Sequence, residues 1–414
     1  MSDRRDIENR ATTPSTEVAG PTSTSTGDER PDPRRVTGTV VAATTGQPLS
    51  GAIVTIGTAS VLTGSDGLFE LSAGIPDDSK MVVERSAWQP FELELPEHDT
   101  LDLDVQLEPL TVRGIRVSRE VAADPARWRE LLDLAEDSSV NTLVFDTKDE
   151  ASTVLYESGV ALANELGAVE VVYDPEKLLA DAHERGLYTI TRIVTFEDAV
   201  WANGDPEAKL AGSWVDAGNP ANWRYPIDLA VEACQLGFDE IQFDYVRFPS
   251  GRTAELAADL VPQTGELRAM AIADFLAAAR VELEAEGCGI SAAIFGIVMS
   301  SDSDERLGQT PETISAVVDA VSPMLYPSHY SPGWLGFADP NDHPGPVIAF
   351  SLDEGGDRVD AGSAMRPWIQ GFYYSGEQIK AQIEEAEARG AGWIIWNAAG
   401  NYRADWLPPS SASG

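Results

Sequence analysis

The chain has 414 residues, of which 68 are acidic and 29 are basic, so its formal net charge is −39. This charge excludes a nucleic-acid partner bound through a broad basic surface, because phosphate contacts need clustered Lys and Arg. It also disfavours electrostatic docking on an anionic membrane. A hydrophobic content of 43% still provides apolar mass for a large folded core.

The N-terminal segment has a composition that cannot build a core. Residues 11–33 contain nine Ser or Thr and four Pro, so residues 1–35 are predicted to be a disordered tail or linker, and residues 408–414 a second tail. Stalks of this kind are common in exported proteins, which favours an extracellular or cell-surface location. The first ten residues show no signal peptide and leave a cytoplasmic location open. No stretch of 18 apolar residues occurs, so no transmembrane segment is predicted.

Residues 36–111 consist of short alternating apolar and polar runs separated by turn residues, such as VTGTVVA, KMVVERSA and LDLDVQLE. This pattern predicts a small all-β sandwich. The motifs TGQPL (45–49), GAIV (51–54) and DGLF (66–69), together with Gly38, resemble the carboxypeptidase regulatory-like domain family. The resemblance implies a seven-stranded sandwich of the transthyretin or immunoglobulin type. No residue of this segment suggests an active site of its own.

Residues 112–407 alternate between predicted strands and amphipathic helices. The eight strand candidates are residues 113–118, 141–146, 187–194, 239–244, 289–296, 320–326, 366–372 and 392–397. Eight strand–helix units over about 300 residues predict an α/β fold of the TIM (β/α)8 barrel type. A doubly wound sheet is the alternative, but it requires a Gly-rich phosphate loop after the first strand, which the segment RVSREVAADP lacks.

Polar and aromatic residues follow the predicted strands, at the end of a TIM barrel where active sites lie. Carboxylates, amides and aromatic rings are the usual groups that hold sugars, since rings stack on apolar sugar faces. The candidate substrate-binding residues are Lys148, Asp149, Arg192, Arg247, Tyr326, His329, Gln370, Trp396 and Asn397.

Asp244 ends the fourth predicted strand and is the first candidate catalytic residue. Ile241 and Phe243 are large and apolar and should face the helices, so Asp244 points into the barrel. A buried carboxylate needs a partner, and the alternative role is a structural ion pair with Arg192 or Arg247. The two roles can coexist, because a neighbouring Arg keeps a nucleophile ionised.

Asp146 is the second candidate catalytic residue. On the second predicted strand Phe145 should face the helices, so Asp146 and Lys148 face the interior. Asp146 is either the second carboxylate of a glycosidase pair or a structural partner of Lys148 or Arg192. The fifth strand ends without a carboxylate, which leaves the acid/base open. The acid/base candidates are Asp146, Asp149 and the loop residues Asp302, Asp304 and Glu305.

Several long motifs carry a resemblance over residues 112–403. The motifs are VFDTKDE, TRIVTF, GFDEIQFDYVRFPS, SPMLYPSHY, RPWIQGF and GWIIWNA. They look like the putative glycoside hydrolase domain family. The resemblance implies a TIM barrel with O-glycosyl hydrolase activity. By analogy with other barrel glycosidases, it gives Asp244 the strand-4 position that serves as nucleophile in many α-retaining enzymes.

The sequence therefore predicts an enzyme that hydrolyses O-glycosidic bonds of an oligo- or polysaccharide with two carboxylates, Asp244 being central. The acidic surface favours a neutral or cationic glycan. No cofactor is expected, and no zinc site, because HxH, HExxH and CxxC spacings do not occur. The competing interpretation is a non-catalytic carbohydrate- or cell-envelope-binding protein on a degenerate barrel. Such a protein would bind glycans without needing Asp244.

The two cysteines lie in neighbouring strand–helix units of the predicted barrel. Cys234 continues an apolar series at helical spacing, as a small buried residue would, and Cys288 precedes the fifth predicted strand. Both positions lie near the bottom of the predicted barrel, where a single disulfide could join them.

Overall fold

The computed structural model describes residues 35–72, 79–96 and 100–410. The predicted tails fall mostly outside these residues, at 1–34 and 411–414. Within the described part, Arg35 begins the first strand, and the carbonyl of Pro408 accepts a hydrogen bond from the N–H of Ser139.

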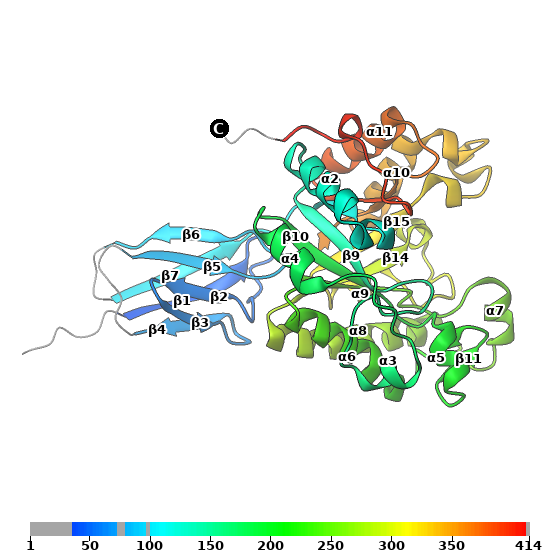
Figure 1. Cartoon of the computed structure of the whole chain (residues 1–414), viewed down its shortest axis with the longest axis horizontal. Helices are drawn as coiled ribbons and strands as arrows, with labels where there is room; N and C mark the ends of the chain where they lie inside the picture. Colours follow the sequence, from blue (N-terminus) through cyan, green and yellow to red (C-terminus); the bar gives the residue numbers. More distant parts are fainter. Residues whose placement is uncertain (1–34, 73–78, 97–99, 411–414) are drawn as a thin grey trace, which may run out of the picture.

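The N-terminal part forms two packed sheets (Figure 1). One sheet has the order β4-β1-β7, with β1 and β7 parallel, and the other has the antiparallel order β3-β2-β5-β6. Alternate residues such as Val40, Val54 and Val83 face inward and form one core. The predicted all-β sandwich is therefore present. Its strands are β1 (Arg35–Ala42), β2 (Ile53–Ile56), β3 (Ala59–Leu62), β4 (Leu68–Leu71), β5 (Lys80–Glu84), β6 (Phe91–Glu94) and β7 (Thr100–Leu107).

The rest of the described chain forms the predicted TIM barrel. Eight strands pair in parallel, and the last pairs with the first, which closes the barrel. They are β8 (Arg113–Arg116), β9 (Thr142–Lys148), β10 (Tyr188–Val194), β13 (Glu240–Asp244), β14 (Gly289–Phe295), β15 (Ala320–Leu325), β17 (Trp368–Gln370) and β18 (Trp393–Trp396). A short strand, β16 (Ala364–Met365), pairs with β15 ahead of β17.

Helices surround the barrel, and several of them begin at a residue whose side chain caps the helix. Asp174 caps α4, Thr264 caps α8, and Ser375 forms a capping box with Gln378 at α11. The main helices are α1 (Arg119–Ala123), α2 (Pro125–Glu136), α3 (Ala161–Glu165), α4 (Pro175–His183), α5 (Ala199–Gly204), α6 (Arg224–Gln235), α7 (Gly251–Leu256), α8 (Gly265–Glu286), α9 (Pro311–Ser315), α10 (Pro344–Gly356) and α11 (Gly376–Glu387). A hairpin of β11 (Lys209–Ala211) and β12 (Trp214–Val215) lies in the loop after β10.

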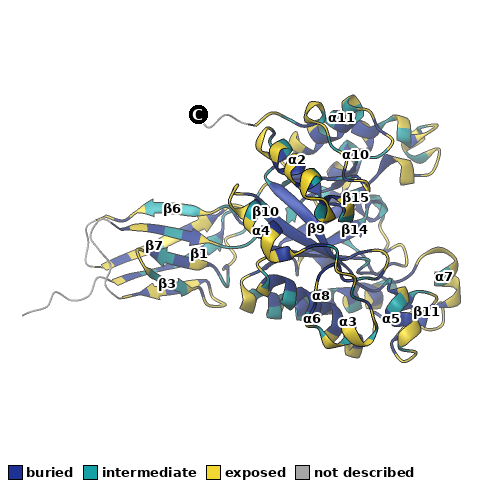
Figure 2. Cartoon of the chain, viewed as in Figure 1, coloured by how far each residue is buried: buried dark blue, intermediate teal, exposed yellow. Residues whose placement is uncertain are grey.

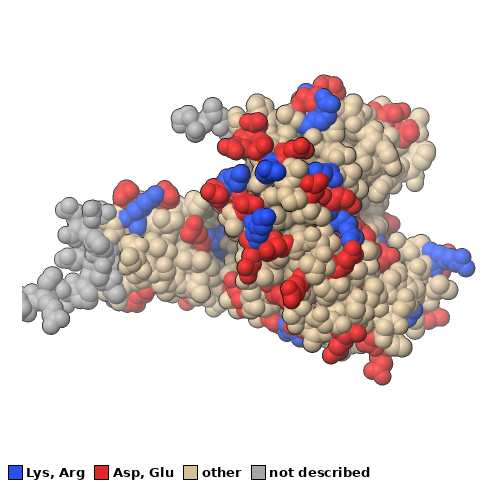
Figure 3. Space-filling view, in the orientation of Figure 1, with Lys and Arg blue, Asp and Glu red and all other residues tan. Residues whose placement is uncertain are grey.

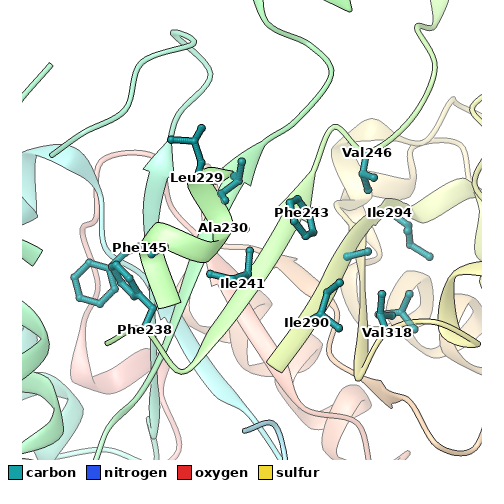
Figure 4. Packing of buried hydrophobic residues seen from close by; sticks show 14 of the residues in the cluster. Phe145, Leu229, Ala230, Phe238, Ile241, Phe243, Val246, Ile290, Ile294 and Val318 are labelled. Carbon is teal, nitrogen blue, oxygen red and sulfur yellow. The ribbon is translucent and has the colours of Figure 1, made fainter. Parts of the chain in front are cut away.

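The barrel has an apolar outer layer and a mixed interior. Ile241 and Phe243 pack between the strands and the helices, as predicted (Figure 4). On the other face of β13, Gln242 donates a hydrogen bond to Ser322 and accepts one from the indole of Trp368. Figure 2 shows the strands buried and the outer faces of the helices exposed. The interior is thus a packed core, and a substrate site can form only at its ends.

Cys234 and Cys288 form a disulfide, with Cα atoms 6.0 Å apart. It joins the end of α6 to the start of β14, near the bottom of the barrel.

The sandwich covers the bottom of the barrel. Ser86 donates a hydrogen bond to the carbonyl of Gly287, Arg85 pairs with Asp319, and the N–H of Ala87 donates to the hydroxyl of Tyr188. Figure 1 shows the sandwich at one end of the molecule and α5, β11 and α7, which belong to loops after barrel strands, at the other. The mouth of the barrel therefore faces away from the sandwich.

The described surface is strongly acidic. Figure 3 shows Asp and Glu spread over the barrel on the visible face, with Lys and Arg scattered among them. None of the described helices combines the length and apolarity that crossing a bilayer requires.

Candidate active site

A pocket of about 520 Å³ opens at the C-terminal ends of the barrel strands. Its charged lining residues are Glu150, Arg192 and Asp244. Most of the remaining wall is aromatic and includes Tyr245, Phe295, Tyr326, His329, Trp334, Trp368 and Trp396. A pocket with a few charged groups among aromatic rings is suited to a small polar ligand with apolar faces.

Arg192 is the centre of the charged group. Its Nε donates to Asp244 Oδ2 at 2.8 Å, its Nη1 to Asp146 Oδ1 at 3.0 Å, and its Nη2 to Glu150 Oε1 at 2.6 Å. Burial alone would lower the pKa of Arg192, but the charges of these three carboxylates raise it well above the usual value. The guanidinium is therefore a fixed cation that orients all three acids.

Asp244 lies at the mouth, where the alternation of β13 predicts it. Besides Arg192, it accepts a hydrogen bond at 2.6 Å from the N–H of Tyr245. Tyr245 has a φ of 51°, a left-handed conformation that bulky residues rarely adopt. Burial and then the charge of Asp244 raise the pKa of Tyr245 to about 12. This strained turn fixes Asp244 and places the Tyr245 ring in the pocket wall.

Glu150 is the second carboxylate of the pocket, and the sequence reasoning missed it. Glu150 Oε1 and Asp244 Oδ2 both bind the guanidinium of Arg192, at 2.6 Å from Nη2 and 2.8 Å from Nε. Two C–N bonds of about 1.33 Å connect these nitrogens, so the two carboxylate oxygens are at most about 8 Å apart. The side chain of Glu150 is 41% exposed. Burial raises the pKa of Glu150, but Arg192 and then Arg116 outweigh this effect and the pKa is lowered. Glu150 is the last residue of the motif VFDTKDE, and this motif is the feature of the sequence that could have identified Glu150 as a site residue.

Asp146 points into the barrel as predicted but lies behind Arg192. Its two oxygens bind Arg116 and Arg192, its side chain is 1% exposed, and it does not line the pocket. This corrects the prediction of Asp146 as the second catalytic carboxylate. It is a structural ion-pair partner, the alternative that the sequence left open.

The interior orientation predicted for Lys148 is wrong. The pairing of β9 with β10 shifts by one residue, so that Arg192 is opposite Asp146 but Ile193 is opposite Lys148. Lys148 therefore follows Ile193 to the outer face. There its Nζ lies 2.6 Å from Asp198 Oδ2, and both side chains are buried. A substrate-binding role for Lys148 is corrected to a structural ion pair.

The carboxylate of Asp149 is hydrogen-bonded within the turn that it begins. Its Oδ1 accepts hydrogen bonds from the N–H of Ala151 and the hydroxyl of Thr153, and Oδ2 faces Arg119 at 3.3 Å. Asp149 does not line the pocket. Its role in the structure is to shape the loop that carries Glu150.

The side-chain amides of Gln370 and Asn397 bind backbone groups of the loops, and neither residue lines the pocket. Gln370 accepts from the N–H of Ser328 and donates to the carbonyl of Phe372. Asn397 donates to the carbonyls of Gly371 and Asn401 and accepts from the N–H groups of Ala399 and Asn401. Because these amide groups are used within the protein, the predicted contacts to substrate are corrected for both residues.

Arg247 does not pair with Asp244. Its guanidinium lies 4.5 Å from the ring centre of Trp214 and 4.3 Å from that of Phe295, and it donates to the carbonyl of Phe248. Burial lowers its pKa. Arg247 supports the pocket wall from behind Phe295.

Tyr326, His329 and Trp396 line the pocket, as predicted. The Trp396 ring lies against Arg116 and Arg192, with ring-to-guanidinium distances of 4.3 and 5.0 Å. Burial lowers the pKa of His329, which favours the neutral form of its ring. Burial and then the charge of Asp244 raise the pKa of Tyr326.

The loop after β14 does not supply an acid to the pocket. Asp304 binds Arg268, and neither Asp302 nor Glu305 lines the pocket. In the described part of the chain, no group of three or more His, Cys, Asp and Glu side chains is arranged to hold a metal ion.

Residues 114–402 match the family model described as "Putative glycosyl hydrolase domain". The chain belongs to this family. The glycoside hydrolase domain of PgaB (BpsB) from Bordetella bronchiseptica has a similar structure, with a TM-score of 0.53 and 13% identity over 73% of this chain and 99% of that one. At this identity the likeness shows the barrel fold alone.

Two further solved structures resemble parts of the chain. A hypothetical protein from Ruminiclostridium thermocellum is 31% identical over 43% of this chain and 96% of that one, with a TM-score of 0.37. A chitinase from Chromobacterium violaceum is 12% identical over 72% of this chain and 97% of that one, with a TM-score of 0.46. No curated protein matches the chain in sequence.

Proposed function

We propose that the barrel hydrolyses O-glycosidic bonds of an oligo- or polysaccharide, with Asp244 and Glu150 as its two carboxylates. The observation that carries this proposal is that both acids line one pocket and bind one guanidinium, that of Arg192. Membership of the glycosyl hydrolase family supports it. So do the aromatic walls, because rings of this kind stack on sugar C–H faces.

Asp244 is the nucleophile or charge-stabilising carboxylate in this proposal. Arg192 and the N–H of Tyr245 both donate hydrogen bonds to it, which fix the position of the carboxylate at the mouth of the pocket. A fixed anion at this place stabilises the positive charge that develops on the sugar ring as the glycosidic bond breaks.

Glu150 is the acid/base in this proposal. In the free protein, Arg192 keeps it ionised. A substrate that draws the half-exposed Glu150 away from Arg192 removes this effect, so the carboxyl group takes up a proton and donates it to the leaving oxygen. A separation of about 5–5.5 Å between the two carboxyl groups gives retention of the anomeric configuration, and about 6.5–9.5 Å gives inversion. The anomer released therefore indicates the distance between the two carboxyl groups during catalysis.

The charged groups that line the pocket are two acids and one base, which supports a neutral or cationic glycan. The disulfide between Cys234 and Cys288 supports the proposed extracellular or cell-surface location, because disulfides persist in oxidising compartments. The Ser/Thr/Pro-rich composition of residues 11–33 agrees with that location.

The alternative function is glycan binding without hydrolysis. The lowered pKa of Glu150 favours it, because in the free protein this acid holds no proton to donate. The two functions differ in their dependence on Asp244, which hydrolysis requires and binding tolerates losing.

The test is release of reducing ends from a panel of soluble poly- and oligosaccharides. We expect Asp244→Asn to lose several orders of magnitude in rate while keeping its thermal unfolding midpoint. Asp302→Asn, in the loop after β14 and outside the pocket, is the matched control and should retain full activity. Full activity of Asp244→Asn on a substrate that the wild type cleaves would overturn the mechanism. Binding without cleavage would establish the alternative.

A further inference from the structure

Tyr373, in the loop after β17, is exposed in a way that packing does not explain. The residue is 95% exposed, the largest exposed fraction among the exposed large hydrophobic residues of the described chain. Its backbone has a φ of 60°, in the left-handed region that Gly or Asn adopts at lower cost. Tyr at this position therefore strains the backbone and buries almost no surface in return.

Strained residues of this kind gather at the mouth of the barrel. Seven described residues other than Gly have positive φ. Ala87 belongs to the sandwich. The other six lie in loops that follow barrel strands: Ser152, Tyr245, Glu305, Arg306, Leu335 and Tyr373. Backbone strain concentrates where function requires a particular side chain, and Tyr245 already illustrates this beside Asp244.

An aromatic path connects Tyr373 to the pocket. Its ring centre lies 5.5 Å from that of Phe372, which lies 5.7 Å from Tyr326 and 6.3 Å from His329. Tyr326 and His329 line the pocket beside Asp244. The ring contacts therefore link the exposed Tyr373, through Phe372, to two residues of the pocket wall.

We infer that Tyr373 is an outer sugar-binding platform, so that the protein takes a glycan chain long enough to reach past the pocket. The inference rests on the proposed glycan chemistry of the pocket. A sugar ring held beside Asp244 carries its neighbours outward along Phe372 to Tyr373. The exposed aromatic ring presents a flat apolar face to the C–H groups of such a sugar, and this stacking carries the contact. Selection for this contact explains why Tyr stands where Gly would be less strained.

Titration calorimetry tests the inference. The probes are the hexasaccharides and disaccharides of β-1,4-linked N-acetylglucosamine, glucose and xylose and of α-1,4-linked glucose, on an Asp244→Asn background that prevents cleavage. We expect Tyr373→Ala to weaken hexasaccharide binding about fivefold to tenfold and to leave disaccharide binding unchanged. Tyr373→Phe should bind like the parent.

Tyr373→Gly adds a readout that separates binding from structure. It should raise the thermal unfolding midpoint by relieving the left-handed strain, and weaken hexasaccharide binding as Tyr373→Ala does. Equal losses for both chain lengths, an unchanged hexasaccharide affinity, or no binding of any probe to the parent protein would overturn the inference.

The proposed hydrolysis is tested separately by reducing-end release. If cleavage occurs but Tyr373→Ala binds long chains normally, the inference fails and the function stands. If no cleavage occurs but long chains need Tyr373, the function fails and the inference stands.

Discussion

Arg192 Nε and Asp244 Oδ2 lie 2.8 Å apart across the adjacent strands β10 and β13. This pair ends a series of alternating charges on four neighbouring strands, which runs Arg116, Asp146, Arg192, Asp244. Each inner member bonds to both neighbours. The acid proposed for catalysis is thus held by the same network that fills the upper barrel, so its position depends on residues that never touch substrate.

Replacing Arg192 by Met should destabilise the protein strongly. The change leaves Asp244 without a cationic partner and Asp146 with Arg116 alone, and removing one partner of a buried ion pair costs about 3–5 kcal/mol. Urea unfolding followed by circular dichroism measures this cost. Arg403→Met removes an ion pair with Asp405 that is exposed on both sides, and it should change little. Equal effects of the two substitutions would show that the buried ion-pair network does not stabilise the protein more than an exposed ion pair does.

The fold could be predicted from hydrophobic alternation, because eight strand–helix units follow one another along the sequence. The seventh strand is where this reasoning loses accuracy. A continuous strand was predicted over 366–372, but the structure has β16 at Ala364–Met365 and β17 at Trp368–Gln370. Pro367 stands between them and has no N–H to donate to a sheet.

The site could be predicted in part. Asp244 and Tyr326 follow regular strands, and the structure places both at the pocket. The second strand ends irregularly, and counting alternate residues cannot detect a register shift that appears only in the pairing with β10. That shift turns Lys148 outward. The backbone partners of Gln370 and Asn397 come from separate loops, which a sequence pattern does not bring together.

Lys148 offers a test of the corrected register. Lys148→Met should cost about 3–5 kcal/mol because it leaves Asp198 buried without its cation. Adding Asp198→Asn should recover part of this loss, since Asn keeps the N-cap to Trp201 and removes the unpaired charge. Guanidinium unfolding of the three variants measures both effects. A Lys148→Met variant with normal stability and weakened glycan binding would contradict the buried ion pair and support a substrate-binding role for Lys148.

The lowered pKa of Glu150 predicts a pH dependence. A group whose pKa falls on folding stabilises the protein above its unfolded pKa, which is about 4.3 for Glu, and this contribution is lost as the pH falls through the folded value. Wild type should therefore be more stable than Glu150→Gln at neutral pH, and the difference should shrink below about pH 4. Thermal unfolding of both proteins between neutral and acid pH measures it. A difference that stays constant over this range would contradict the ion pair with Arg192.

The disulfide should contribute measurably to stability. Cys234 and Cys288 are 54 residues apart in the sequence, and closing a loop of that length stabilises by about 4 kcal/mol in the chain-entropy account. We expect dithiothreitol to lower the urea midpoint of the wild type. The double variant Cys234→Ala/Cys288→Ala should start at the lower midpoint and show no response to the reductant. A wild type that is insensitive to reduction would contradict the bond.

Tyr188 connects the sandwich to the barrel floor. Its hydroxyl accepts a hydrogen bond from the N–H of Ala87 at 2.7 Å and donates to Glu240 at 3.1 Å, while burial and then Glu240 raise its pKa. Tyr188→Phe leaves the Ala87 N–H without this partner, which should cost about 1–3 kcal/mol. Hydrogen exchange at residues 85–88 should rise together with the loss of thermal stability. Tyr373→Phe removes a hydroxyl from an exposed ring and is the matched control. If the two substitutions have the same effect, the sandwich is held on the barrel without this bond, by contacts such as the Arg85–Asp319 ion pair and the hydrogen bond from Ser86 to the carbonyl of Gly287.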